Sequence, residues 1–121
     1  MDIDFFLDDP ERVPSPRDEI RITSMSASPA EDGMRVRVMI DLTPFTPDVR
    51  HSLMIAITGN EGAVLSETSI IETDQHRITL TMHLHQTPPA GEDRLELHAA
   101  LYFDPEKPQH IVSTGFSLSA P

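Results

Sequence analysis

The sequence predicts an all-β fold, a seven-stranded antiparallel Greek-key β-sandwich of immunoglobulin-like type with an extended N-terminal tail. Apolar and polar residues alternate with a period of two along seven short segments, the pattern of strands that bury one face. All 11 prolines and all but one of the 5 glycines fall outside these segments, where turns are expected. No segment shows a helical period, so crossover helices are not expected and neighbouring strands should pair antiparallel.

The chain divides into an acidic tail, residues 1–18, and a β-sandwich domain, residues 19–121. A length of 121 residues suits one domain. In the tail, Pro10, Pro14 and Pro16 exclude a regular helix or a central strand, so residues 8–18 are expected to be an extended linker.

The start of the tail combines apolar side chains with carboxylates. Ile3, Phe5, Phe6 and Leu7 lie between aspartates, a composition typical of a short peptide that folds when it docks on a partner. The alternation of Ile3, Phe5 and Leu7 equally fits an edge strand or plug on the protein's own sandwich, and plain disorder is the third alternative.

The predicted strands are residues 19–27, 34–42, 52–58, 63–72, 76–85, 94–103 and 109–118. Those at 76–85 and 94–103 flank the break QTPPAGED and are expected to form a hairpin. Phe45, in the loop 43–51, is expected to cover one end of the core. The residues expected to face the core are Ile20, Ile22, Ser24, Val36, Val38, Ile40, Leu42, Leu53, Ile55, Ile57, Ile78, Leu80, Met82, Leu84, Leu95, Leu97, Ala99, Leu101, Phe103, Val112, Thr114, Phe116 and Leu118.

Two positions depart from clean alternation. Residues 63–72 have apolar side chains on both predicted faces, which indicates a bulge or an edge strand and leaves their sheet undetermined. Gly115 lies inside the last strand, which indicates a bulge or a close backbone approach.

The order of strands, with Leu95-x-Leu97-x-Ala99-x-Leu101 on the sixth, resembles immunoglobulin-like and fibronectin type III modules over residues 19–118. The chain departs from those modules at two points, because it has no Trp and carries Leu95 where the tyrosine of the corner motif is expected. The resemblance implies a binding or spacer module and transfers no catalytic residue.

Composition excludes several kinds of protein. The absence of Cys removes disulfides, zinc–thiolate sites and thiol nucleophiles, and a net charge of −11 disfavours nucleic acid as a ligand. No apolar run approaches the roughly 20 residues of a membrane span, and the acidic start is unlike a secretory signal, so a cytoplasmic location is expected. Nucleophile-elbow and phosphate-loop motifs are absent, and Ser113 and Thr114 have no predicted base beside them.

Four residues of the predicted hairpin form a candidate metal site: His83, His85, Glu96 and His98. Spacing of two puts each pair on one strand face, and a pairing in which residue numbers sum to about 179 sets His83 opposite Glu96. Such neighbours lie about 5–8 Å apart, within reach of one Zn²⁺ ion. The His-x-His spacing is similar to that of metal-binding cupin barrels, although the further Glu of those barrels is not matched. The same residues also fit an ordinary polar strand face.

The remaining candidates are surface residues. His51, His76 and His110 lie at strand ends and are expected to be solvated. Met54 and Tyr102 are expected to form an adhesive patch if their strands adjoin, since Met and Tyr are enriched at interfaces. The sequence therefore favours a non-enzymatic module that binds another protein, or a second copy of itself, through a sheet face or through Ile3, Phe5, Phe6 and Leu7. A surface metal site is the alternative function.

Overall fold

The computed structural model describes residues 19–45, 49–59, 62–85, 94–104 and 106–118. Within these ranges the chain forms seven strands and no α-helix, which confirms the predicted all-β class and the number of strands. No helix in them has the length and apolar character of a membrane span. The strands are β1 (Ile22–Pro29), β2 (Arg35–Leu42), β3 (His51–Thr58), β4 (Val64–Thr73), β5 (Arg77–His83), β6 (Arg94–Asp104) and β7 (Lys107–Ser117).

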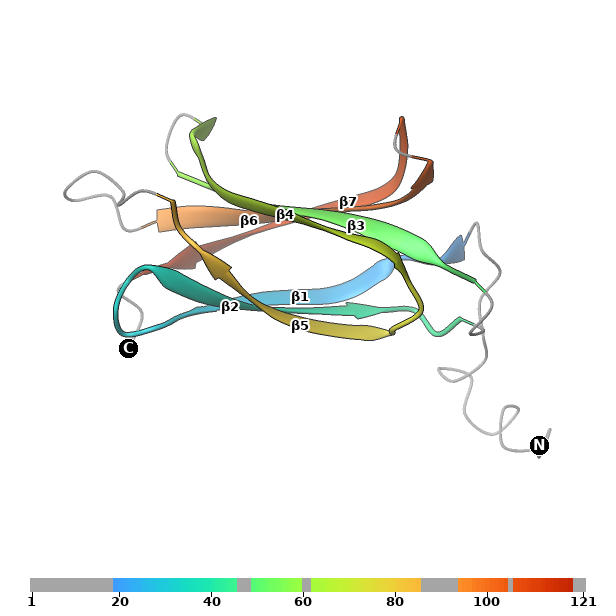
Figure 1. The fold of residues 1–121 in the computed structure, drawn as a ribbon, viewed down its shortest axis with the longest axis horizontal. Helices are drawn as coiled ribbons and strands as arrows, with labels where there is room; N and C mark the ends of the chain where they lie inside the picture. The colour runs from blue at the N-terminus through green and yellow to red at the C-terminus, as the bar shows by residue number, and fades with distance from the viewer. Residues whose placement is uncertain (1–18, 46–48, 60–61, 86–93, 105, 119–121) are drawn as a thin grey trace.

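The strands build two sheets that lie one over the other (Figure 1). Sheet A has three strands in the order β1-β2-β5, and sheet B has four in the order β4-β3-β6-β7. Every neighbouring pair is antiparallel. The fourth strand, whose sheet the sequence leaves undetermined, lies beside β3 at the edge of sheet B.

The predicted hairpin of residues 76–85 with 94–103 is wrong. β5 pairs with β2, with Val38 opposite Leu80, whereas β6 pairs with β3 and β7. The alternation identified the apolar faces of β5 and β6 correctly, but it did not specify which strand lies beside each of them. The two apolar faces meet across the core from opposite sheets instead of lying side by side, and both arrangements bury the same side chains.

Alternation places the core between the sheets. Val38, Ile40, Ile55 and Leu97 are fully buried, and Phe45 covers one end of the core with 2% of its surface exposed, as predicted. Ser24 is exposed, contrary to the prediction. The register of β1 shifts between Ile22 and Ser24, and this irregularity turns Ser24 outward, where its hydroxyl donates to the Asp41 carboxylate over 2.8 Å.

Both predicted explanations for the irregular fourth strand are confirmed. β4 is an edge strand, and its pairing with β3 shifts twice, between His51 and Leu53 and between Ile57 and Thr58. The bulge predicted at Gly115 is absent, because Gly115 stands directly opposite Glu96 in a regular stretch of the β6–β7 ladder. The shifts in that ladder occur instead around Tyr102.

The strands β1 and β7 connect the two sheets along one side of the sandwich. The His110 ring accepts a hydrogen bond at Nδ1 from the Ile22 backbone N–H over 2.9 Å, and the Gln109 amide donates to the Ile20 carbonyl over 3.0 Å. His110 is therefore a half-buried structural residue and not the fully solvated one that its position suggested.

Candidate functional site on the outer face of sheet B

The outer face of sheet B is formed by the side chains that alternate with the core residues of its four strands. On β3, Leu53, Ile55 and Ile57 are buried, so Met54, Ala56 and Thr58 point away from the core. The same alternation on β6 buries Leu97, Ala99 and Leu101 and turns the side chains between them outward. The register between strands then decides which outward side chains are neighbours.

One row of this face is apolar. Met54 stands opposite Ala100, and Ala100 stands opposite Ile111 on β7. Tyr102 lies one step along, opposite Ser52, so Met54 and Tyr102 are diagonal neighbours on adjoining strands. The sequence analysis required that the strands of Met54 and Tyr102 adjoin, and they do. Met54 is 45% exposed and Ile111 is 62% exposed, which makes the row open to a second surface.

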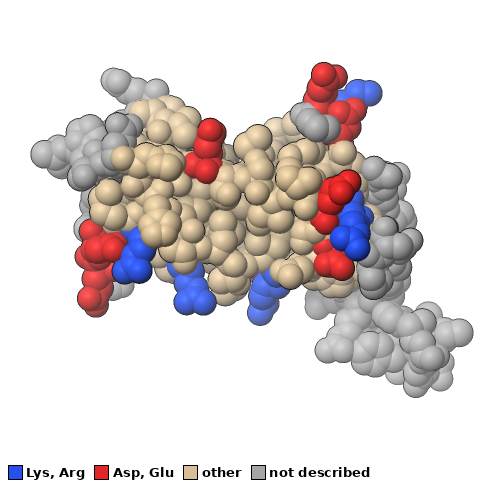
Figure 2. Space-filling model, in the orientation of Figure 1, with Lys and Arg blue, Asp and Glu red and all other residues tan. Residues whose placement is uncertain are grey.

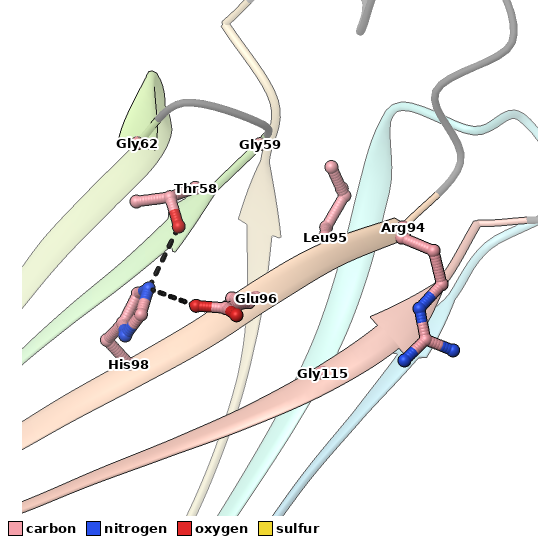
Figure 3. Close-up of a pocket in the computed structure, with 8 residues that line it drawn as sticks. All are labelled: Thr58, Gly59, Gly62, Arg94, Leu95, Glu96, His98 and Gly115. Carbon is pink, nitrogen blue, oxygen red and sulfur yellow. Dashed lines mark hydrogen bonds and ion pairs between the residues drawn. The ribbon is translucent and has the colours of Figure 1, made fainter.

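The next row carries a hydrogen-bonded histidine. His98 stands opposite Ala56 on one side and Ser113 on the other. Its ring Nδ1 lies 2.7 Å from the Ser113 hydroxyl oxygen. Its Nε2 lies 2.8 Å from the Thr58 hydroxyl oxygen, a contact drawn in Figure 3. A Glu96 carboxylate oxygen lies 3.5 Å from the same Nε2. Both ring nitrogens therefore have partners, which fixes the plane of the ring.

The network borders a hollow of about 410 Å³. In Figure 3, Thr58, Glu96 and His98 gather at one side of it and Arg94 lies at the other, beside Gly115. The lining residues are Thr58, Gly59, Gly62, Arg94, Leu95, Glu96, His98 and Gly115. A hollow with a guanidinium, a carboxylate and an imidazole can hold polar groups of both signs.

Sequence reasoning missed the contact between His98 and Ser113. Ser113 was expected to have no base beside it, yet the β6–β7 ladder puts an imidazole at hydrogen-bonding distance. The missed signal was the pairing of Asp104 with Lys107, two residues whose numbers sum to 211. The same sum pairs His98 with Ser113. Because Ser113 is exposed, this hydrogen-bonded pair lies at the surface of sheet B.

The structure does not assemble the predicted metal site. His83 faces outward from sheet A opposite Arg35, and the backbone N–H of His85 donates to the Leu65 carbonyl over 2.8 Å. Glu96 and His98 belong to sheet B, so the four side chains do not converge. Within the described ranges, no group of three or more His, Cys, Asp and Glu residues could hold a metal ion. The site depended on the β5–β6 hairpin, which does not form.

The predicted docking residues have different outcomes. Ile3, Phe5, Phe6 and Leu7 lie outside the described residues, so their role stays a prediction. Met54 and Tyr102 lie together on the outer face of sheet B, and their role in an interface also stays a prediction.

His51 differs most from its sequence-based expectation. It was expected to be solvated, but it is 1% exposed, and neither ring nitrogen has a hydrogen-bond partner among the residues that the structure describes. Its ring contacts Phe45 edge-on and lies 6.5 Å from the Phe103 ring. Burial lowers the pKa of His51 to about 4, and the charge of nearby His76 acts in the same direction, whereas Asp74 opposes the shift. His51 is therefore a neutral core residue.

No family model and no curated protein matches this sequence. Solved structures match it in fold. A glycosyl hydrolase family 2 member from Bacteroides cellulosilyticus DSM 14838 aligns with a TM-score of 0.57 and 8% identity, over 82% of this chain and 15% of that chain. The β-glucuronidase from Ruminococcus gnavus, in complex with uronic isofagomine, aligns with a TM-score of 0.51 and 11% identity, over 83% of this chain and 15% of that chain.

The chain thus spans about one sixth of the length of these structural neighbours. At 8% and 11% identity the likeness shows the fold alone, an all-β arrangement of two sheets. The substrates of those enzymes are properties of the full-length enzymes, of which this chain covers 15%.

Proposed function

We propose that this chain is a non-catalytic, immunoglobulin-like module that docks a separate folded protein through the outer face of sheet B. The observation that carries the proposal is the apolar row Met54, Ala100 and Ile111, with Tyr102 beside it, on adjoining strands. Large exposed apolar side chains gathered on one face are typical of interaction surfaces.

The strand order supports an immunoglobulin-like topology. Constant-type immunoglobulin domains place their first, second, fifth and fourth strands in one sheet and the third, sixth and seventh in the other. This chain has the same division except that β4 lies beside β3 instead of β5. An edge strand can change sheets in this way because it has a neighbour on one side only.

The neighbouring row supplies specificity. An apolar row alone accepts many surfaces, whereas the fixed His98 ring and its two hydroxyl partners present directional donors and acceptors beside it. Glu67, Glu96 and Arg94 are exposed on the same face, so the expected partner surface has an apolar centre and charged groups of both signs at its rim.

The structural neighbours support the role of a module. In them a comparable sandwich accounts for 15% of a long polypeptide. A sandwich within such a chain is expected to contribute packing surfaces, so docking to another domain suits this fold without catalytic groups of its own.

The test compares two charge insertions on opposite faces. Met54→Asp disrupts the apolar row of sheet B, and Met39→Asp makes the same change at an exposed methionine on sheet A. We expect proteins that co-purify with the wild-type chain from its native host to be lost with Met54→Asp and kept with Met39→Asp. For a partner identified in this way, hydrogen exchange should slow in β3, β6 and β7 of the complex.

Two results would contradict the proposal. Equal retention of the partner by both variants would remove the sheet B face from the interaction. Sedimentation of the purified wild-type chain as a dimer that Met54→Asp dissociates would show that a second copy, and not a different protein, covers the face.

A further inference from the structure

The outer face of sheet A differs from the rest of the chain in charge and chemistry. Its middle strand, β2, turns Arg35, Arg37 and Met39 outward, and β5 turns Arg77, Thr79 and Thr81 outward beside them. On the other side, β1 contributes Ser24, Ser26 and Ser28. Figure 2 shows Lys and Arg side chains projecting along the lower rim, where sheet A lies in Figure 1, with Asp and Glu only toward the ends of that rim.

Two of the three arginines are paired and one is not. Arg35 lies 2.8 Å from the Asp32 carboxylate, and Arg77 lies 2.7 Å from the Asp41 carboxylate. Arg37 has no ion-pair or hydrogen-bond partner among the described residues. It stands in a row between Ser28 and Thr81, at a shallow hollow of about 320 Å³. A guanidinium flanked by hydroxyls is a good receptor for a carboxylate.

The chain has a segment of matching chemistry. Residues 2–9 read DIDFFLDD, four aspartates around Ile3, Phe5, Phe6 and Leu7. Carboxylates suit Arg37 and the adjacent hydroxyls, and aromatic rings suit both guanidinium faces and the exposed thioether of Met39, which stands between Ser26 and Thr79.

We propose that residues 2–9 dock on the outer face of sheet A of the same chain, with an aspartate paired to Arg37 and the aromatic rings over Met39. The aspartates and the aromatic residues of the segment both contribute. The aspartates favour this face, because the described outward side chains of β2 and β5 include three arginines and a single aspartate, Asp41. Burying the phenylalanines then adds apolar contact to the ion pair.

The connection is long enough. Glu19 lies three residues before β1, which forms one edge of sheet A. The 10 peptide steps from Asp9 to Glu19 span up to about 35 Å when extended. The 8 residues of β1 extend over about 27 Å. The segment can therefore reach any point of the face. A tether of this length also keeps the local concentration of the segment in the millimolar range, so weak contacts suffice.

Docking of this kind leaves sheet B open. The tail covers one face of the sandwich while the apolar row of Met54 and Ile111 on the other face stays available to a partner. The tail contact depends on exposed charges, so salt should weaken it more than the apolar contacts of sheet B.

The absence of Cys from the chain permits a clean experiment in the full-length protein. A nitroxide spin label is attached to Ser26→Cys on sheet A or, as the control, to Ser69→Cys on sheet B. We expect the backbone amide signals of residues 2–9 to broaden at least twofold with the Ser26 label and to keep their widths with the Ser69 label. Arg37→Glu, or 0.5 M NaCl, should remove the broadening, whereas the matched charge reversal Lys107→Glu, at the turn between β6 and β7, should leave it.

Each other outcome overturns the proposal. Unchanged widths with both labels would mean that the segment does not visit sheet A, and equal broadening with both would mean that it does not select a face. A mixture of ¹⁵N-labelled chain without nitroxide and unlabelled chain with nitroxide distinguishes a contact within one chain from a contact between two chains. Broadening in that mixture would assign the contact to a second copy of the chain.

Discussion

The ring of Phe45 meets the ring of His51 edge-on, with centroids 4.8 Å apart and an angle of 87° between the planes. Phe45 is also hydrogen-bonded to His76, whose Nε2 lies 2.9 Å from the Phe45 carbonyl oxygen. The loop after β2 is thereby attached to the start of β3 and to the residue before β5. The centre of this attachment is the buried His51 imidazole, which has no hydrogen-bond partner within the described part of the chain.

Acid should destabilise the fold through His51. Its pKa of about 4 in the folded chain lies below the ordinary value of 6.5, so the unfolded chain binds more protons between these values. The free energy of unfolding is unaffected by the protonation of His51 above pH 6.5 and decreases as pH drops toward 4, by up to about 3 kcal/mol. Urea denaturation from pH 4 to 8 measures this slope.

His51→Leu should flatten that slope, since it removes the titrating group and its two orphaned nitrogens. At pH 7 the variant should be as stable as the wild type or more stable by about 1 kcal/mol. His83→Gln, an exposed histidine of sheet A, serves as the control and should keep the wild-type slope. A slope that persists in His51→Leu would assign the acid sensitivity to another group.

Leu97→Ala should destabilise the chain by about 3 kcal/mol, because it removes a fully buried side chain opposite Ile57 and leaves a cavity. Met54→Ala, one strand away on the outer face, should cost less than about 0.5 kcal/mol. Chemical denaturation midpoints at constant slope compare the two. Similar losses would mean that Met54 is packed in the isolated chain.

The glycines should respond according to their backbone conformation. Gly33 and Gly62 have φ of 68° and 77°, so replacement by Ala should cost about 1 kcal/mol at each. At Gly115 a Cβ atom would lie 3.4 Å from the Arg94 guanidinium nitrogen and 3.8 Å from the Leu95 carbonyl oxygen. Gly115→Ala should therefore be neutral or slightly stabilising in the same denaturation assay. A loss above about 1 kcal/mol there would reveal a backbone constraint that the regular ladder does not show.

The exposed pair between Arg77 and Asp41 should contribute little. The Arg77 guanidinium and the Ser24 hydroxyl lower the pKa of Asp41, so the contribution is present above pH 3.8 and declines as pH falls through the lowered value. Because the Arg77 side chain is 69% exposed, Arg77→Ala should lower the urea denaturation midpoint only slightly at neutral pH. The loss should shrink further in 1 M NaCl, and a loss that salt leaves unchanged would point to packing by the arginine stem.

Local pattern was sufficient for the strands and for most of the core. The period-two alternation at Val36, Val38 and Ile40 determines which side chains turn inward whatever lies beside the strand. Turn residues such as Gly33 bound the strands through their own backbone preferences. These features depend on neighbours in sequence, so the sequence alone determined them.

The candidate site needed contacts between distant segments. Glu96 and His98 were recognised as outward-facing residues, but their partners were misassigned to β5 because alternation does not specify a neighbouring strand. Thr58 lies 40 residues from His98 in sequence and touches it only because β3 and β6 pair. His51 likewise has a polar side chain that tertiary packing buries.

By itself, then, the sequence of this protein determined seven strands, the inward faces of most of them, the covering role of Phe45 and an acidic tail. Only the tertiary structure decided that β5 and β6 belong to different sheets and that β4 joins β3. It also decided that His98 is hydrogen-bonded to Thr58 and Ser113 and that His83 lies on the other sheet. The physical reason is that pleating fixes a side chain's direction locally, whereas sheet membership follows from how seven apolar faces close over one core.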